Sequence, residues 1–223
     1  MGGLGQQVHG GRQGTALKTP ATGTPDLFLR RLPVALVAGV ILWLLLRPAV
    51  DIGVSGFAQT LIRAFEHPRV TRLVVDDHRV QIHRSDFRSG SGIPTVSLVE
   101  NNFNLIVLLA LYLALPQPFS RRQLERLFMG CCVLYLTQTL NLVFHVKTLY
   151  AAGLGEWSRQ SYSDLARNIF GFGRYFTDLP GRFSFPFLIW LGFNWDVVMR
   201  MLRLGEEEKA NRTAKPKARE KQS

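Results

Sequence analysis

Apolar residues of this chain are gathered into four blocks that polar segments separate. The blocks cover residues 32–46, 96–115, 127–146 and 183–204. A helix needs roughly 20 apolar residues to cross the hydrocarbon core of a bilayer. The first block is shorter than that, but after Arg47 it resumes as PAVDIGVSGFAQTLIRAF. The simplest interpretation is one long helix over residues 30–66, whose last turns leave the membrane as an amphipathic extension.

The pattern changes after this helix from helical to alternating. The stretches VTRLVVDD, RVQIHR and IPTVSLV alternate or are rich in β-branched residues, which is typical of strands. Asp76, Asp77 and His78 would form the first turn, and the Ser/Gly run over residues 89–92 a looser second turn. The sequence therefore predicts a small three-stranded antiparallel sheet outside the bilayer, within residues 67–95.

The third block carries a stripe with polar members along one helical face. Cys131, Leu134, Gln138, Asn141 and His145 follow one another at spacings of three or four residues, which places them on one side of a helix. Amide and imidazole groups are costly in lipid unless they find partners. This face is therefore expected to point towards other helices.

Together these patterns predict a mainly α fold: a four-span transmembrane helix bundle with a small antiparallel β insertion between spans one and two. A short basic turn joins spans two and three, which makes them antiparallel neighbours. The full division is a disordered leader (1–29), the first transmembrane helix with its extension (30–66), the β-rich insertion (67–95), a transmembrane hairpin (96–146), an interfacial aromatic and basic segment (147–182), a fourth transmembrane helix (183–204) and a disordered tail (205–223).

Basic residues lie between and beyond the apolar blocks and give a formal net charge of +11. Such a charge suits a protein against anionic lipid or one that binds nucleic acid. No basic segment is combined with a stacking platform or a groove-reading motif, so the bilayer is the expected partner and nucleic acid is not. Slightly more than half of the 27 Lys and Arg residues fall on the side of the termini. The positive-inside rule then places both termini in the cytoplasm.

The candidates for catalytic and metal-binding residues are the cysteines and histidines. Cys131 and Cys132 are adjacent, and His145 follows thirteen or fourteen residues later on the same predicted helix. That separation is roughly 20 Å along a helix, so His145 cannot activate either thiol. His78 and His83 fall in a turn and a returning strand, without metal-binding spacing. We therefore expect no catalytic residue, no metal, no cofactor and no enzymatic activity.

Polar residues from three predicted spans approach one layer near the outer side of the bilayer. The candidates for binding a partner or substrate are Arg47, Asp51, Glu100, Asn101, Asn102, Gln138, Asn141 and His145. Arg47 and Asp51 are four residues apart and can pair on one helical face. Two interpretations stay open for this layer: an outward-opening binding pocket, or interhelical hydrogen bonds that only fix the bundle.

The order and texture of these segments resemble a known family. The stretches LLLRPAVDIGVSGFAQTLIRAF, NNFNLIVLLALYLALP, RRQLERLFMGCCVLYLTQTLNLVF and RFSFPFLIWLGFN, with the β-rich insertion after the first, look like the exosortase H-associated membrane proteins. The resemblance covers residues 32–204. It implies a bacterial inner-membrane accessory of an exosortase, a multi-span cysteine transpeptidase-like enzyme that processes C-terminal sorting signals at the outer face. The resemblance assigns no functional residue.

The leading hypothesis is a non-enzymatic, multi-pass protein of the bacterial inner (plasma) membrane. It would assist exosortase-type protein sorting or cell-envelope assembly by binding an exosortase or its sorted substrate. The alternative is a small membrane carrier or lipid-handling protein that uses the polar layer around Arg47 and His145. A weaker third hypothesis is a membrane hydrolase that uses Cys131 or Cys132.

Overall fold

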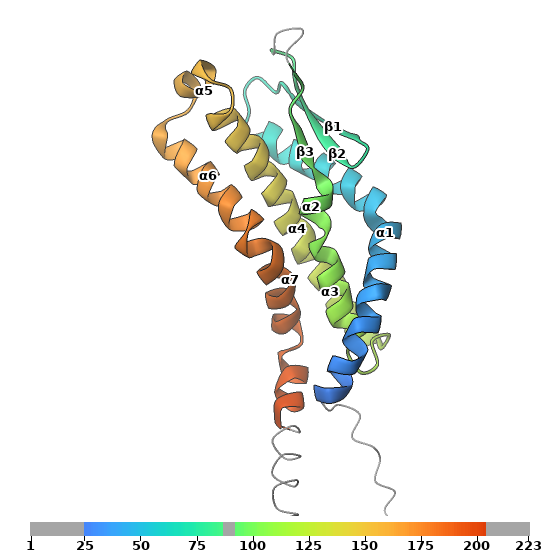
Figure 1. Cartoon of the computed structure of the whole chain (residues 1–223). Helices are drawn as coiled ribbons and strands as arrows, with labels where there is room; N and C mark the ends of the chain where they lie inside the picture. The colour runs from blue at the N-terminus through green and yellow to red at the C-terminus, as the bar shows by residue number, and fades with distance from the viewer. Residues whose placement is uncertain (1–24, 87–91, 204–223) are drawn as a thin grey trace, which may run out of the picture.

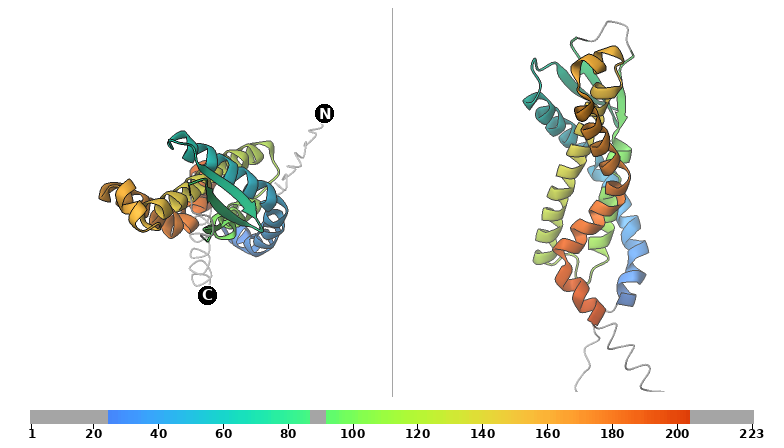
Figure 2. Two further views of the ribbon diagram at one scale, coloured as in Figure 1. Left: turned by 90° about the horizontal axis from the view of Figure 1, so that it is seen from above. Right: turned by 90° about the vertical axis from the view of Figure 1, so that its left-hand side faces the viewer.

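Two long helices run along the molecule, and a small sheet lies at one end of them (Figure 1). The computed structural model describes residues 25–86 and 92–203. Helix α1 covers Pro25–Ala64 and helix α4 covers Arg121–Ala152. Seen from above, the strands lie across the bundle (Figure 2). The predicted tail over residues 205–223 and most of the predicted leader lie outside the described residues.

Helix α1 is continuous although Pro33 and Pro48 lie within it, as the single-helix interpretation predicted. It begins earlier than predicted, at Pro25, so the last residues assigned to the leader over 1–29 are helical. Asp26 in the first turn favours this start because its charge complements the helix dipole. The Phe28 ring also stacks on Trp190, with 5.7 Å between ring centroids, and this contact holds the first turns against the bundle.

The sheet is antiparallel with the strand order β1-β2-β3, as predicted. Strands β1 and β2 cover Thr71–Asp76 and Arg79–Arg84, and β3 covers Thr95–Ser97. Asp77 and His78 connect β1 to β2 with positive φ angles of 39° and 64°, the conformation of a two-residue hairpin turn.

The predicted boundary between the β insertion (67–95) and the second span (from 96) is wrong. Val96 belongs to β3, where it pairs with Val80 of β2, and the helix begins only at Leu98. The expected span is itself divided into α2, Leu98–Asn102, and α3, Asn104–Leu113. The two helices are separated at Phe103, which is assigned to neither of them.

The C-terminal boundaries also differ from the prediction. Helix α4 continues to Ala152 rather than ending at 146, and the interfacial segment predicted over 147–182 is mostly helical. It contains α5, Glu156–Ser161, and α6, Asp164–Asp178. Helix α7 covers Pro180–Phe193, with its proline in the first turn, so it starts before the predicted 183. A further helical stretch covers residues 195–203.

The mainly helical class with a small antiparallel sheet is confirmed, but four spans are not. Among the described residues, α1 and α4 are the two helices long and apolar enough to cross a membrane. The fourth predicted span is divided at Asn194 into α7 and the stretch over 195–203, and at about 1.5 Å per residue the 14 residues of α7 by themselves reach roughly 21 Å. Only 17% of the most apolar window of α1 and 33% of that of α4 are buried. These apolar surfaces therefore suit contact with lipid.

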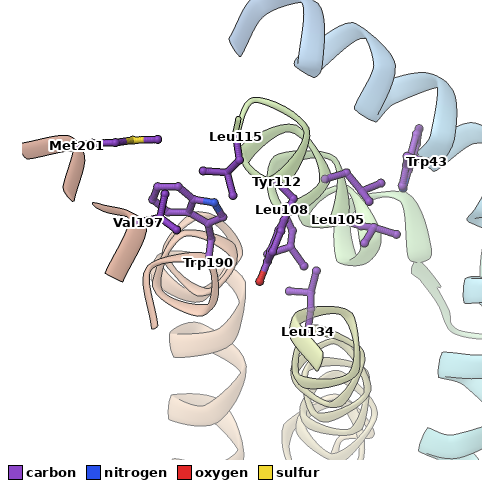
Figure 3. Close-up of a cluster of buried hydrophobic side chains, with 10 residues drawn as sticks. Trp43, Leu105, Leu108, Tyr112, Leu115, Leu134, Trp190, Val197 and Met201 are labelled. Carbon is purple, nitrogen blue, oxygen red and sulfur yellow. The ribbon is translucent and has the colours of Figure 1, made fainter. Parts of the chain in front are cut away.

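Two hydrophobic clusters lie one beyond the other along the bundle. The first joins α1, α3, α4 and α7 around Trp43, Leu108, Leu134 and Trp190, and Figure 3 shows these side chains converging. The second joins the sheet to α1 and α4. Its fully buried members are Val54, Ala58, Ile62, Val80, Ile82, Leu98, Leu142, Val146 and Tyr150. A short polar stretch separates the two clusters on α1, on α4 and between Leu98 of α2 and Leu105 of α3.

Candidate functional site

A buried carboxylate, Asp51, is the centre of this polar layer. Asp51 lies on α1 and is 1% exposed. Its Oδ1 accepts a hydrogen bond of 2.6 Å from Asn102 Nδ2, and its Oδ2 lies 3.1 Å from His78 Nδ1. Arg47 Nε lies 3.7 Å from the same oxygen, and the Arg47 guanidinium lies over the Trp43 ring. The carboxylate therefore ties α2 and the β1–β2 turn to α1.

A chain of side-chain amides continues this network from α2 to α4. Asn101 Nδ2 donates to Asn102 Oδ1 at 3.1 Å and to the backbone oxygen of Gln138 at 3.2 Å. Gln138 Nε2 donates to Asn104 Oδ1 at 2.7 Å. We call Arg47, Asp51, His78, Asn101, Asn102, Asn104 and Gln138 the Asp51 network. It crosses the layer between the two hydrophobic clusters, and its bonds hold α1, α2, α3, α4 and the hairpin turn together.

A cavity of about 340 Å³ opens next to this network, beside the edge strand of the sheet. Its volume falls in the range of small-ligand sites, roughly 300–1,000 Å³. Residues 94–97, which include β3, form one wall. The polar side chains that line the cavity are Glu100, Asn101, Asn141, His145, Arg174, Asp178 and Arg182. We call this cavity the β3 pocket.

Helix α6 reaches the pocket because its glycine permits a close approach to α4. A Cβ built on Gly173 would come within 2.5 Å of the Phe144 ring of α4, so a larger residue would push α6 away. Thr148 Oγ1 on α4 also donates to the Phe170 oxygen of α6 at 2.9 Å. These contacts position Arg174 and Asp178 at the pocket wall.

The charges in the β3 pocket are only partly paired. Arg182 binds both Asp178 and Glu100, with 3.6 Å to the Glu100 Oε2 atom. His145 Nε2 lies 3.6 Å from Asp178 Oδ2. The Arg174 side chain is exposed and forms no ion pair or hydrogen bond with any described residue, and the hydrogen bond from Thr177 Oγ1 goes to the Arg174 backbone oxygen. One positive charge at the wall is thus available to a ligand.

Two buried amide oxygens in the pocket have no hydrogen-bond partner. Asn101 and Asn141 are 7% and 6% exposed, and the Oδ1 atom of each is unpaired within the part of the chain that the structure describes. Buried polar atoms are nearly always hydrogen-bonded, and leaving one unpaired costs about 1–3 kcal/mol. Both oxygens are themselves shielded from solvent, so an N–H donor of a bound molecule can pair with them once the amide groups turn towards the cavity.

A second polar cluster lies around Arg84 of β2. The Arg84 guanidinium stacks between the rings of Tyr150 and Trp157, at 4.8 and 4.7 Å from their centroids. It pairs with Glu66 at 3.4 Å and with Asp86 at 2.7 Å. We call these five residues the Arg84 cluster. The Glu66 carboxylate of this cluster also accepts hydrogen bonds from the backbone N–H and the side-chain hydroxyl of Thr71.

The pKa shifts in this cluster follow from the same contacts. Burial on its own would lower the pKa of Arg84, but the hydrogen bond and charge of Asp86, with the charge of Glu66, outweigh it and raise the pKa. The hydrogen bond from Arg84 lowers the pKa of Asp86. Both groups are therefore held in their charged forms.

The eight candidate residues from the sequence fall into two neighbouring groups. Five of them, Arg47, Asp51, Asn101, Asn102 and Gln138, belong to the Asp51 network. Glu100, Asn141 and His145 line the β3 pocket, and Asn101 lines it as well. No hydrogen bond or ion pair among the described residues joins Arg47 to His145, so the layer is not one cluster around these two. Whether these residues bind a partner stays a prediction.

Sequence reasoning missed four residues that complete these groups. His78 was assigned to an exposed turn, yet it binds Asp51, 27 residues earlier. Arg174, Asp178 and Arg182 were placed in an interfacial segment, but they line the pocket. Their spacing of four residues was the available signal, since it places the three charges on one side of a helical segment.

The cysteines stand apart from both groups. Cys131 and Cys132 are free, one partly buried and one exposed, and neither lines the β3 pocket. Within residues 25–86 and 92–203, no group of three or more His, Cys, Asp or Glu side chains could hold a metal ion.

Long apolar helices, a buried polar layer and a sheet at one end define a helical membrane protein. A family model described as exosortase H-associated membrane protein matches residues 24–197, which is most of the chain. The chain therefore belongs to this family, as its resemblance indicated. No curated protein and no solved structure matches the chain. The family description supports a membrane location and an association with an exosortase.

Proposed function

We propose that the chain is a non-enzymatic, multi-pass accessory of the bacterial inner membrane that binds an exosortase or its sorted substrate. In this role it assists protein sorting or assembly of the cell envelope. Family membership supports the association with an exosortase. The exposed apolar faces of α1 and α4 support insertion in the bilayer.

The observation that carries this proposal is the unsatisfied polar surface of the β3 pocket. The Asp51 carboxylate needs no ligand, since it has three partners. In the pocket, by contrast, the Asn101 and Asn141 oxygens and the Arg174 guanidinium lack partners among the described residues. Such groups offer hydrogen bonds that a bound protein segment would complete.

The proposed orientation has both termini in the cytoplasm and the sheet with the β3 pocket at the outer face. This is where the sequence resemblance implies that exosortases act. A reporter that is active only in the cytoplasm, fused after the last residue, should be active. A cysteine introduced at Asp86, beside the sheet, should react with a reagent that does not cross the membrane. The opposite labelling would reverse the orientation.

The direct test is co-purification with the exosortase encoded in the same genome. The tagged chain should retain the enzyme in mild detergent, and Arg174→Gln together with Asn141→Leu should reduce the amount retained. Arg159→Gln is a matched control because Arg159 is exposed on α5 and does not line the pocket. A monodisperse chain that retains neither the enzyme nor its substrate after crosslinking would contradict the proposal.

A further inference from the structure

The outer edge of β3 carries backbone groups that point away from β2. Ile82 N donates to Pro94 O and Leu98 N donates to His78 O, at 2.9 and 3.0 Å. In an antiparallel ladder the hydrogen-bonded residues alternate, so Val96 also faces β2. Thr95 and Ser97 between them direct their N–H groups to the other side. β3 is the last strand of the sheet, and that side has no further strand among the described residues.

The free edge and the unsatisfied side chains belong to the same cavity. Thr95 and Ser97 form the wall on the side of the sheet, and Asn101 and Asn141 lie on α2 and α4. Arg174 lies on α6. The cavity thus presents backbone donors and an acceptor from β3 and one unpaired positive charge, and two unpaired but shielded amide oxygens adjoin it.

We propose that the β3 pocket binds an extended peptide segment of a partner protein, which adds to β3 as a fourth strand. A carboxylate of the same segment binds Arg174. This inference rests on the proposed accessory function and specifies where and how the partner is held. An extended peptide matches the cavity because its N–H and C=O groups alternate along each edge. Its N–H groups can donate to the Thr95 oxygen and to the Asn oxygens, and its C=O groups can accept from Thr95 N–H.

A lipid headgroup fits these groups less well. A phosphate would bind Arg174, but it has no N–H donors for the Asn101 and Asn141 oxygens and no use for the strand edge. Exposed strand edges are the common template for pairing with another chain. The three backbone groups of β3 therefore favour a peptide over a lipid.

The test measures the binding of synthetic peptides to the full chain in nanodiscs of phosphatidylcholine. Short overlapping peptides would cover the exosortase of the same genome and the C-terminal segments of its substrates. At least one carboxylate-bearing peptide should bind. N-methylation of alternate amides on one of its edges should abolish binding, while methylation of the other edge should leave it unchanged. This asymmetry is specific to strand addition, and equal tolerance of both methylations would overturn the proposal.

Substitutions in the protein then test the same contacts that the modified peptides test. Thr95→Pro removes the outward N–H without touching a ladder bond to β2, and binding should weaken about tenfold, as the loss of one or two hydrogen bonds predicts. Thr95→Ala keeps that N–H and should bind normally. Arg174→Gln should weaken the carboxylate peptide but not its neutral amide analogue. Should Thr95→Pro fail to fold, the methylated peptides still decide the question on the natural chain.

The outcomes separate this inference from the proposed function. If the exosortase co-purifies equally with the natural chain, Thr95→Pro and Arg174→Gln, strand addition is overturned and the accessory function stands. If peptides of unrelated sequence bind with the expected edge asymmetry but the exosortase never co-purifies, the accessory function falls instead. Displacement of a bound peptide by phosphatidylglycerol, with no edge asymmetry, would identify a lipid headgroup as the occupant.

Discussion

The Arg84 cluster and the β3 pocket both adjoin the small sheet, but their buried polar groups are paired to different extents. Arg84 is enclosed by two aromatic rings and two carboxylates. In the β3 pocket, Asn101 and Asn141 are equally buried but each keeps an unpaired oxygen. Both regions connect the sheet to α4, so the difference does not come from their place in the fold.

This difference indicates which region stabilises the protein and which is available for binding. A buried charge that has all its partners is costly to disrupt, because removing one partner leaves the other uncompensated. An unpaired buried acceptor already lacks its hydrogen bond in the free protein, and a donor on a ligand can supply that bond. The comparison therefore predicts large effects on stability at Arg84 and small ones at Asn141.

The largest expected loss of stability follows from Arg84→Met. The substitution keeps much of the side-chain volume but leaves Glu66, which is 9% exposed, without its cation. Breaking a buried pair in this way should lower the free energy of unfolding by about 3 kcal/mol. Urea unfolding in detergent micelles would measure it. Arg79→Met, on an exposed position of the same strand, should change stability little, and an equal loss for both variants would contradict the enclosed role of Arg84.

A smaller loss is expected from Asp51→Asn in the polar layer. The amide keeps the shape of the side chain but removes the charge that His78, Arg47 and Asn102 share. Hydrogen bonds to charged groups contribute about 1.5–3 kcal/mol, so a loss near 2 kcal/mol is expected in the same assay. Asp76→Asn at an exposed strand position is the control. No difference between the two variants would show that Asp51 does not hold the hairpin to α1.

Short-range patterns in the sequence predicted much of the fold. The periodicity of α1 predicted one helix through Arg47, and the alternation after it predicted three antiparallel strands with a turn at Asp77. Spacing alone also predicted the Arg47–Asp51 pair. The boundary at Val96 was wrong because a short apolar run fits the start of an apolar helix as well as the end of a strand, and the pairing with Val80 decides between them.

Contacts between distant segments account for what the sequence did not predict. His78 reaches Asp51 only because the hairpin folds over α1, which no local pattern encodes. Arg174 enters the pocket because Gly173 lets α6 approach α4. The polar residues of α1, α2 and α4 were predicted to approach one layer, but their division between the Asp51 network and the β3 pocket depends on side-chain geometry.

Asn141→Leu tests the expectation that an unpaired residue of the pocket contributes little to stability. Leucine has a similar volume and removes an oxygen that has no partner, so the free energy of unfolding should stay within about 0.5 kcal/mol or rise. Asn102→Leu is the matched contrast, since the Asn102 amide donates to Asp51, and it should be clearly destabilising. A large loss for Asn141→Leu would mean that this oxygen is satisfied and that the pocket is not open.

The smallest expected effect is the pH dependence at the rim of the Arg84 cluster. The hydrogen bond from Arg84 lowers the pKa of Asp86 below its usual 3.8, so the folded state favours the charged carboxylate. This contribution is complete above pH 3.8 and is lost as the pH falls through the lower pKa of the folded state. The Asp86 side chain is 46% exposed, so solvent and salt screen the pair and the effect is small. Asp86→Asn should therefore be slightly less stable than the natural chain at neutral pH, and the difference should disappear in acid and in high salt. Unfolding curves at several pH values would measure it, and a difference that grows in acid would reverse the sign of the argument.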